Sequence, residues 1–309
     1  MKTYNAINAF INDSLWLILP EKLDAMIDVI RGKQAGFTIS DEAAEKMTAA
    51  SNRNRQSKVN RNVAVLPIYG VISQKMNMMA AMSGGTSTEL IGAEFDSLMA
   101  DASVDAIVLD IDSPGGNYYG TPELASKIFA ARGTKPIVAV ANSLAASAAY
   151  WIASAADELV VSPSGDVGSI GVLAVHEDYS AANEQVGVKP TYITYGKHKA
   201  ETNPDSPLSA EAAEHLQASV DAAGKAFEKS VAAHRGTTAK DVHENFGQGR
   251  CYAAKEAMAR KMADRVGTLS SEVERLQTAS RVRRGRRVEI QRQKLGLLSI
   301  KNCYNIPPD

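Results

Sequence analysis

The chain has 309 residues, 45% of them hydrophobic, and a formal net charge of −1 at pH 7. This length and hydrophobic content allow one large core with appendages, and the near-zero charge excludes a general attraction to nucleic acid or to a membrane surface. The two cysteines, Cys251 and Cys303, lie far apart in the sequence, which argues against a disulfide framework and fits a reducing compartment.

The first residues lack the basic stretch and the sustained apolar run of a secretory signal. Residues 15–19 are apolar but too few to cross a bilayer, which takes about 20 residues. We therefore expect a soluble, cytoplasmic protein with no membrane contact. Helices are expected over residues 20–32 and 41–50, followed by a polar, basic linker over residues 51–61.

From residue 62 onward, short apolar runs alternate with segments of helical periodicity. This alternation predicts an α/β fold with a mainly parallel sheet covered by helices, and functional loops at the C-terminal ends of the strands. The expected strands are 63–72, 106–111, 137–140, 158–161, 171–175 and 191–195. The expected helices are 87–99, 122–131, a segment after Ser147, 181–186, 209–234 and 253–266, with a methionine-rich loop at 75–86.

Ser147 stands where the strand 137–140 gives way to a helix of small residues. The unpaired N–H groups and partial positive charge of a helix N-terminus stabilise a developing anion, which suits a nucleophilic serine. Taken alone, however, the segment is better explained as a buried helix whose serine bonds to nearby backbone. The surrounding loops reverse that preference.

Two glycine-containing loops follow expected strands. Gly115 and Gly116 expose backbone amides, which can form an oxyanion hole for a tetrahedral acyl intermediate. In residues 165–171, Ser169 offers a hydroxyl that can hold an amine, and the loop lacks the Lys-Ser or Lys-Thr of a phosphate-binding loop. An ordinary turn is the alternative explanation for each loop by itself.

A third loop, residues 196–204, carries two lysines directly after the expected strand 191–195. A lysine can serve as the base for Ser147 when burial lowers its pKa from about 10.4 toward about 7–8, although a basic surface loop is the ordinary alternative. A triad with His198 is a less favoured possibility. The five histidines are dispersed and none has metal-ligand spacing, so no metal site is expected.

Four motifs in this order resemble the signal peptide peptidase A family of serine peptidases: Ser-Pro-Gly-Gly at 113–116, the small-residue run 145–153, Val-Gly-Ser-Ile-Gly-Val at 167–172, and Gly-Lys-His-Lys at 196–199. The last motif, followed by Asn203-Pro204, is similar to the phage branch of capsid-assembly proteases of the lambda type. The likeness covers about residues 62–269. It implies a ClpP/crotonase-like spiral of β-β-α units, here with helical additions at both ends.

The resemblance implies a Ser-Lys dyad that works without metal or cofactor. The roles that it carries over by motif are Ser147 as nucleophile, Lys199 as general base, Gly116 and Ala148 with Gly115 at the oxyanion hole, and Ser169 as the residue that orients the lysine.

The chain departs from the family at two places. Relatives often have glycines where this chain has Ala148-Ala149, a change that leaves the amides intact. They have Asp-Gly where it has Glu201-Thr202, a change that alters the turn holding Lys199.

We therefore expect a serine endopeptidase that cleaves polypeptides, among them scaffold or capsid proteins, during phage or prophage head assembly. Two other classes stay open. A crotonase-type acyl-CoA enzyme shares the implied fold and oxyanion hole but uses carboxylates in place of the dyad. A non-catalytic, scaffold-binding protein would carry the dyad as a vestige.

Three parts are expected along the chain: a helical extension and linker at 1–61, the peptidase domain at 62–269, and a basic, flexible tail at 270–309. A solvated tail is favoured over one that contacts nucleic acid. The long helix 209–234 and residues 15–19 and 75–86 carry more apolar surface than one α/β layer buries. We therefore predict a cyclic homo-oligomer with this helix near the subunit contact.

Overall fold

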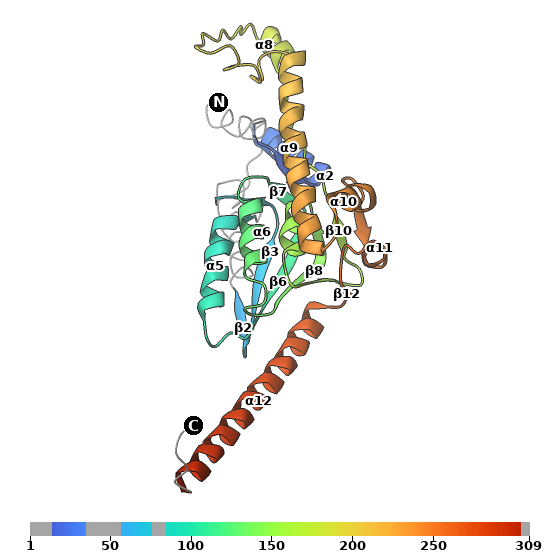
Figure 1. Cartoon of the computed structure of the whole chain (residues 1–309). Coiled ribbons are helices and arrows are strands. Elements are labelled where there is room, and N and C mark those ends of the chain that lie inside the picture. The colour runs from blue at the N-terminus through green and yellow to red at the C-terminus, as the bar shows by residue number, and fades with distance from the viewer. Residues whose placement is uncertain (1–13, 35–56, 76–84, 304–309) are drawn as a thin grey trace.

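The computed structural model describes residues 14–34, 57–75 and 85–303 (Figure 1). The expected helix 41–50, most of the linker and nearly all of the methionine-rich loop lie outside the described residues. The helix expected at 20–32 is confirmed as α2 (Pro20–Gln34). Within the described residues, no helix is both long and apolar enough to span a membrane.

A twisted, mainly parallel sheet forms the centre of the molecule, so the predicted α/β class is confirmed. Parallel pairs join β3 to β6, β6 to β8, and β8 to both β9 and β10. Their side chains form near-continuous apolar runs because both faces of the sheet are covered. The strands are β2 (Lys58–Asn60), β3 (Val63–Tyr69), β6 (Ala106–Ser113), β8 (Ile137–Ala146), β9 (Glu158–Val161), β10 (Asp166–Gly168), β11 (Cys251–Ala253) and β12 (Arg265–Val266).

The two faces of this sheet bury different sets of side chains. Because side chains alternate along a strand, Ile107 and Leu109 of β6 enter the larger cluster, beneath α5 (Thr88–Ala100), α6 (Thr121–Ala130) and α7 (Ala148–Ser154). Val108 of β6 points the other way, into a smaller cluster that includes Val273 and Leu276 of α12 (Leu269–Cys303).

Helix α12 begins where the flexible tail was expected. Its first turns close the second face of the sheet: Val273 and Leu276 are buried, and the nearly buried Glu272 accepts hydrogen bonds from Arg265 and Arg275. The rest of the helix extends away from the body (Figure 1). The sequence did not predict this packing, because the many arginines in the later turns of α12 outweigh the few apolar residues in its first turns.

A second, smaller sheet has the strand order β1 (Trp16–Ile18), β7 (Gly115–Asn117), β4 (Ile72–Ser73) and β5 (Thr86–Ser87). It places an N-terminal strand directly beside the two glycines of the expected oxyanion hole.

Residues 174–209, here called the arm, project from the body and include α8 (Ser180–Gln185). The arm lies at the far end of the long helix α9 (Ala210–Arg235) from the sheet (Figure 1). The strand expected at 191–195 is wrong for the single chain, since this segment pairs with no strand among the described residues and Ile193 is 96% exposed. The strand expected at 171–175 is reduced to one bridge, between Leu173 and Trp16.

The last expected helix, 253–266, is shorter than predicted. It forms α11 (Ala254–Ala259) and then yields to β12, which pairs with β9. Helix α10 (Ala239–Asn245) precedes it and starts at the side-chain cap of Thr238.

Candidate active site

Ser147 occupies a strained turn between β8 and α7. Its φ of 55° and ψ of −115° lie in a region that non-glycine residues rarely adopt, at a cost of about 1–3 kcal/mol. The Ser147 N–H donates to the Gly168 carbonyl (2.7 Å), and the Ser147 carbonyl accepts the Trp151 N–H (3.0 Å). The backbone is therefore fixed from both sides, and the side chain is held at the sharp junction of strand and helix.

The Ser147 hydroxyl has no hydrogen-bond partner among the described residues, although the residue is only 1% exposed. A buried hydroxyl without a partner costs free energy, and such groups concentrate where a ligand or a catalytic partner completes the site. The strain and the unsatisfied oxygen mark the same residue.

Gly116 lies in β7 at a place where only glycine fits. A Cβ added to Gly116 would meet the Ile72 carbonyl oxygen at 1.9 Å, and one added to Gly115 would lie 3.0 Å from the Ala146 oxygen. Gly115 therefore lies against Ala146, the residue that precedes Ser147, while Gly116 lies against Ile72 of β4.

The two expected oxyanion-hole glycines have different roles. Ser113 Oγ accepts the Gly115 N–H (3.2 Å) and donates to the Gly70 carbonyl (2.6 Å), which engages the Gly115 amide within the loop. Gly116 is thus the better placed of the two to donate to a substrate. Ala148 is the first residue of α7, where N–H groups have no acceptor inside the helix.

Ser169 lies close to Ser147 through the backbone. Its N–H donates to the Arg250 carbonyl (2.8 Å), while the preceding Gly168 accepts the Ser147 N–H (2.7 Å). Ser169 is 5% exposed and has a φ of 53°. The predicted nucleophile Ser147 and the predicted lysine-orienting Ser169 therefore lie at the ends of the neighbouring strands β8 and β10.

Lys199 is not brought to Ser147 within the chain. It lies exposed on the arm, where Lys197 pairs with Glu211 (2.7 Å) at the start of α9. Phe227 of α9 stacks on Trp151 of α7 with ring centroids 4.5 Å apart. The sixteen residues from Glu211 to Phe227 span about 24 Å of helix, so the arm is held far from the nucleophile.

His198 lies on the arm beside Lys199 and is equally far from Ser147. Its Nδ1 pairs with Glu201 (2.7 Å), and its ring is half exposed. Within one chain the structure therefore assembles neither the Ser-Lys pair nor the histidine alternative.

The C-terminal end of α7 is held by a residue that carried no sequence signal. The Arg132 guanidinium donates to the carbonyls of Ser154 (2.8 Å), Ala155 (2.9 Å), Ala156 and His234 (3.1 Å). A cation suits the negative end of a helix, and these bonds satisfy carbonyls that the helix leaves unpaired. Arg132 belongs to no motif, so only the fold reveals it.

His234 supports α7 from the neighbouring helix. Ser154 Oγ uses its single hydrogen on the Trp151 carbonyl (2.8 Å), so the His234 Nδ1 lying 2.9 Å away must be the donor to that oxygen. Burial, and secondarily the charge of Arg132, lowers the pKa of His234 to about 4. The ring is therefore neutral near pH 7.

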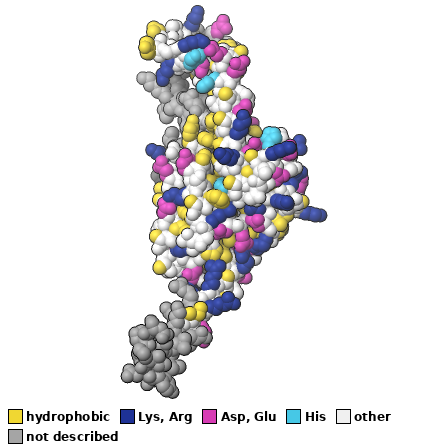
Figure 2. All heavy atoms as spheres, viewed as in Figure 1, with side chains coloured by type: hydrophobic (Ala, Val, Ile, Leu, Met, Phe, Trp, Pro, Cys, Tyr) yellow, Lys and Arg dark blue, Asp and Glu magenta, His cyan; other side chains and the backbone are white. Residues whose placement is uncertain are grey.

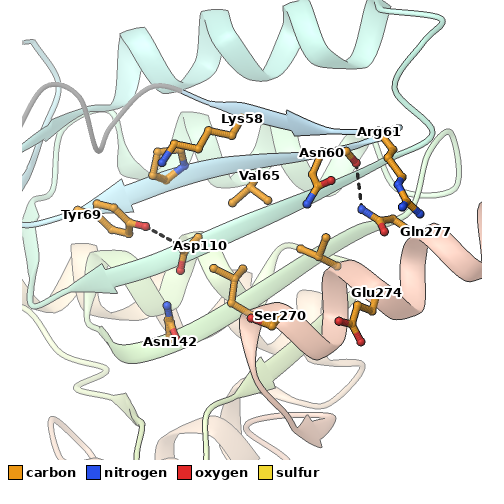
Figure 3. Close-up of a pocket in the computed structure, with 13 residues that line it drawn as sticks. Lys58, Asn60, Arg61, Val65, Tyr69, Asp110, Asn142, Ser270, Glu274 and Gln277 are labelled. Atoms are coloured by element: carbon orange, nitrogen blue, oxygen red, sulfur yellow. Dashed lines mark hydrogen bonds between the residues drawn. The ribbon is translucent and has the colours of Figure 1, made fainter.

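A separate cavity of about 700 Å³ lies between α12 and the sheet, on the face away from α7 (Figure 3). Asp110 and Asn142 point into it, and the Tyr69 hydroxyl donates to Asp110. Burial raises the pKa of Asp110, and the second carboxyl oxygen has no partner among the described residues. Ser147 does not line this cavity.

The remaining chemistry-bearing groups give no sign of metal or thiol catalysis. Across residues 14–34, 57–75 and 85–303, no cluster of three or more histidine, cysteine or acidic residues could hold a metal ion. Burial raises the pKa of the Cys251 thiol to about 11, which disfavours the reactive thiolate.

Comparison with known proteins identifies similar sequences. Residues 130–283 match the model of Peptidase family S49. The chain is 35% identical over 210 residues to capsid assembly protease C of Escherichia phage lambda, covering 68% of this chain and 47% of that protein. It is 36% identical over 201 residues to head-tail preconnector protein GP5 of Enterobacteria phage P21, covering 65% and 40% respectively. The chain thus spans less than half the length of either relative.

The family match runs from the end of α6 into α12 and includes Ser147, Ser169 and Lys199; Gly116 precedes it. The chloroplastic serine protease SPPA of Arabidopsis thaliana is 28% identical over 209 residues, 67% of this chain and 31% of that protein. Among solved structures, a ClpP1 mutant from Listeria monocytogenes matches 66% of this chain and 91% of its own, with a TM-score of 0.42 and 14% identity.

Proposed function

We propose that this chain, which belongs to peptidase family S49, is a serine endopeptidase that cleaves peptide bonds through an acyl-enzyme on Ser147. One observation carries the proposal: the buried Ser147 hydroxyl has no partner among the described residues and sits on a strained turn next to the Gly115-Gly116 strand. Strain of this kind is stored at sites that need a preorganised side chain.

In this mechanism Ser147 Oγ attacks the peptide carbonyl carbon while a neutral lysine takes its proton. The amides of Gly116 and Ala148 donate to the oxygen that becomes negative. When the tetrahedral intermediate collapses, the lysine returns the proton to the leaving amine, and water then hydrolyses the ester by the same route.

We assign the lysine to Lys199 of a second copy of the chain. Within one chain, Lys199 is exposed and about 24 Å of helix separates its loop from the region of Ser147. The arm also exposes large apolar side chains, among them Ile193 (96%) and Tyr195 (103%). Hydrophobic side chains are visible at this end of the molecule in Figure 2. Apolar surface of this kind favours an interface. Moving the amine from water into the buried site would favour its neutral form, which is the form that a base requires.

The substrate and place of action follow from the relatives' names and are part of the same proposal. One relative is called a capsid assembly protease and another a head-tail preconnector protein. We accordingly place this chain in phage or prophage head assembly, in the host cytoplasm or the prohead. Its substrates there are scaffold or capsid polypeptides.

The test combines chemical labelling with proteolysis. A fluorophosphonate probe should label Ser147 in the full chain, and digestion of an unfolded protein such as casein should disappear in Ser147→Ala. The matched control is Ser143→Ala, an exposed serine on the same strand, which should keep full activity. A protein that labels nowhere and still digests casein, or that loses activity equally in both variants, would contradict the proposal.

A further inference from the structure

The strand β1 lies antiparallel beside β7, the strand that carries Gly116. Trp16 is opposite Asn117, Leu17 opposite Gly116 and Ile18 opposite Gly115. The Leu19 N–H donates to the Pro114 carbonyl (3.1 Å), and the Tyr118 N–H donates to the Leu15 carbonyl (3.0 Å). The N-terminal segment therefore adds a complete strand to the edge next to the proposed oxyanion hole.

The other edge of β1 is also paired. Trp16 and Leu173 exchange two hydrogen bonds, with the Trp16 N–H donating at 2.8 Å and the Leu173 N–H at 3.0 Å. Leu173 follows the Ser169 loop in sequence. The segment 15–19 therefore lies between β7 on one side and Leu173 on the other, and both belong to loops around Ser147.

The register sets the Leu17 carbonyl against the Gly116 amide. Hydrogen-bonded pairs in an antiparallel ladder recur at every second residue, so the bonds of Leu15 with Tyr118 and of Leu19 with Pro114 make Leu17 and Gly116 a hydrogen-bonded pair. In such a pair the Gly116 N–H donates to the Leu17 carbonyl. A Cβ on Gly115 would lie 2.1 Å from the Leu17 carbonyl oxygen and 3.0 Å from the Ala146 carbonyl oxygen. The Leu17 peptide therefore lies close to Ala146, the residue before Ser147.

The side chains of this segment anchor it on both sides. Leu17 is fully buried in the main core, whereas Trp16 and Ile18 point the other way and pack with Leu23 and Ile27 of α2. The segment is therefore held by its own helix and by the body at the same time.

We propose that β1 occupies the strand position of the polypeptide substrate and keeps the site closed until it is displaced. The inference rests on the proposed peptidase function, and it adds a substrate class. Leu17 takes the place of the residue whose carbonyl Ser147 attacks, so the enzyme accepts extended segments with an aliphatic side chain at that position. β-Strand addition of this kind binds through the main chain and selects through alternate side chains.

Loosening β1 tests the closure. Leu17→Ala removes the buried side chain, and Trp16→Pro removes the N–H that Leu173 accepts. Each should label with a fluorophosphonate at Ser147 about tenfold faster than the unmodified chain, because truncating a buried leucine weakens its segment substantially. Asp24→Ala, on an exposed position of α2, is the control and should label at the unmodified rate. Melting temperatures identify any variant that does not fold.

Equal labelling of the unmodified chain and both β1 variants would overturn the closure, while leaving the peptidase assignment intact. Labelling of Ser147 in none of them would overturn both. The register has its own readout in the unmodified chain: mass spectrometry of casein fragments should show aliphatic residues, leucine above all, on the N-terminal side of the cuts. Cuts without that preference would overturn the assignment of Leu17.

Discussion

Ser147 combines a backbone that disfavours its side chain with a hydroxyl that lacks a partner among the described residues. If the strain serves catalysis, removing it should stabilise an inactive protein. We predict that Ser147→Gly is inactive but more stable than Ser147→Ala by roughly 1 kcal/mol, since glycine adopts positive φ without penalty and alanine does not. Thermal unfolding of the two variants measures the difference. An alanine variant as stable as the glycine variant would mean that the turn stores no strain.

Asp110 provides a second test at the scale of one side chain. Burial raises its carboxyl pKa above the ordinary value of 3.8, so the native state binds a proton more tightly than the unfolded state. Its contribution to stability is present below pH 3.8 and is lost as the pH rises through the raised pKa. Asp110→Asn cannot ionise and keeps an acceptor for the Tyr69 hydroxyl.

We therefore expect Asp110→Asn to unfold at a higher temperature than the unmodified chain at pH 8, and at nearly the same temperature at pH 3. Asp112→Asn, an exposed position on the same strand, is the control and should change little at either pH. A loss of stability at pH 8 would show that the Asp110 carboxylate has a partner that the structure does not contain.

At the scale of elements, α7 is fixed at both ends, by the strained turn of Ser147 and by Arg132. Lysine in place of Arg132 keeps the charge but reaches fewer carbonyls. We predict that Arg132→Lys lowers the free energy of unfolding by about 3 kcal/mol, since buried carbonyls lose charged hydrogen bonds. The control is Lys127→Ala, which removes an exposed ion pair between α6 and Asp96 of α5 and should cost less than about 1 kcal/mol. Urea titration measures the free energy of unfolding of each variant. Equal losses in the two variants would refute the role of Arg132.

The elements that the sequence predicted are those whose pattern is local. Strands β3, β6, β8 and β9 are runs of β-branched and aliphatic residues buried on both faces, and the helices between them have clear periodicity. Residues 191–195 show the same local pattern but pair with no strand in the part of the chain that the structure describes. The residue types of this segment favour a strand, but a β-strand also requires a neighbouring strand to pair with.

The candidate site divides in the same way. Ser147 and Ser169 directly follow the parallel strands β8 and β10, and Gly116 lies in β7 just after β6, so the topology brings the three together as expected. The separation of Lys199 depends on the length and direction of α9, which no motif encodes. The pairing of β1 with β7 joins segments about a hundred residues apart, and its three residues are too few to give a periodic signal.

At the scale of the whole molecule, the arm is the surface that one chain leaves uncovered. The sequence predicts a subunit contact near the helix 209–234, yet Phe227 of this helix is fully buried against Trp151 within the chain. The most exposed large apolar side chains, Ile193 and Tyr195, lie instead on the arm. We predict that Ile193→Asp reduces the oligomer mass measured by light scattering at micromolar concentration and lowers peptidase activity in parallel. Val266→Asp, a half-exposed position on β12, is the control for surface charge.

We propose that Ser147 of one copy works with Lys199 of another, and a mixture of two inactive variants tests this pairing. Ser147→Ala and Lys199→Ala should each be inactive alone. Unfolded together and refolded at a one-to-one ratio, they should recover about a quarter of the unmodified activity, because a random ring pairs an intact serine with a neighbour's intact lysine at that frequency. A mixture as inactive as its components would contradict the account, as would a Lys199→Ala variant that is fully active alone.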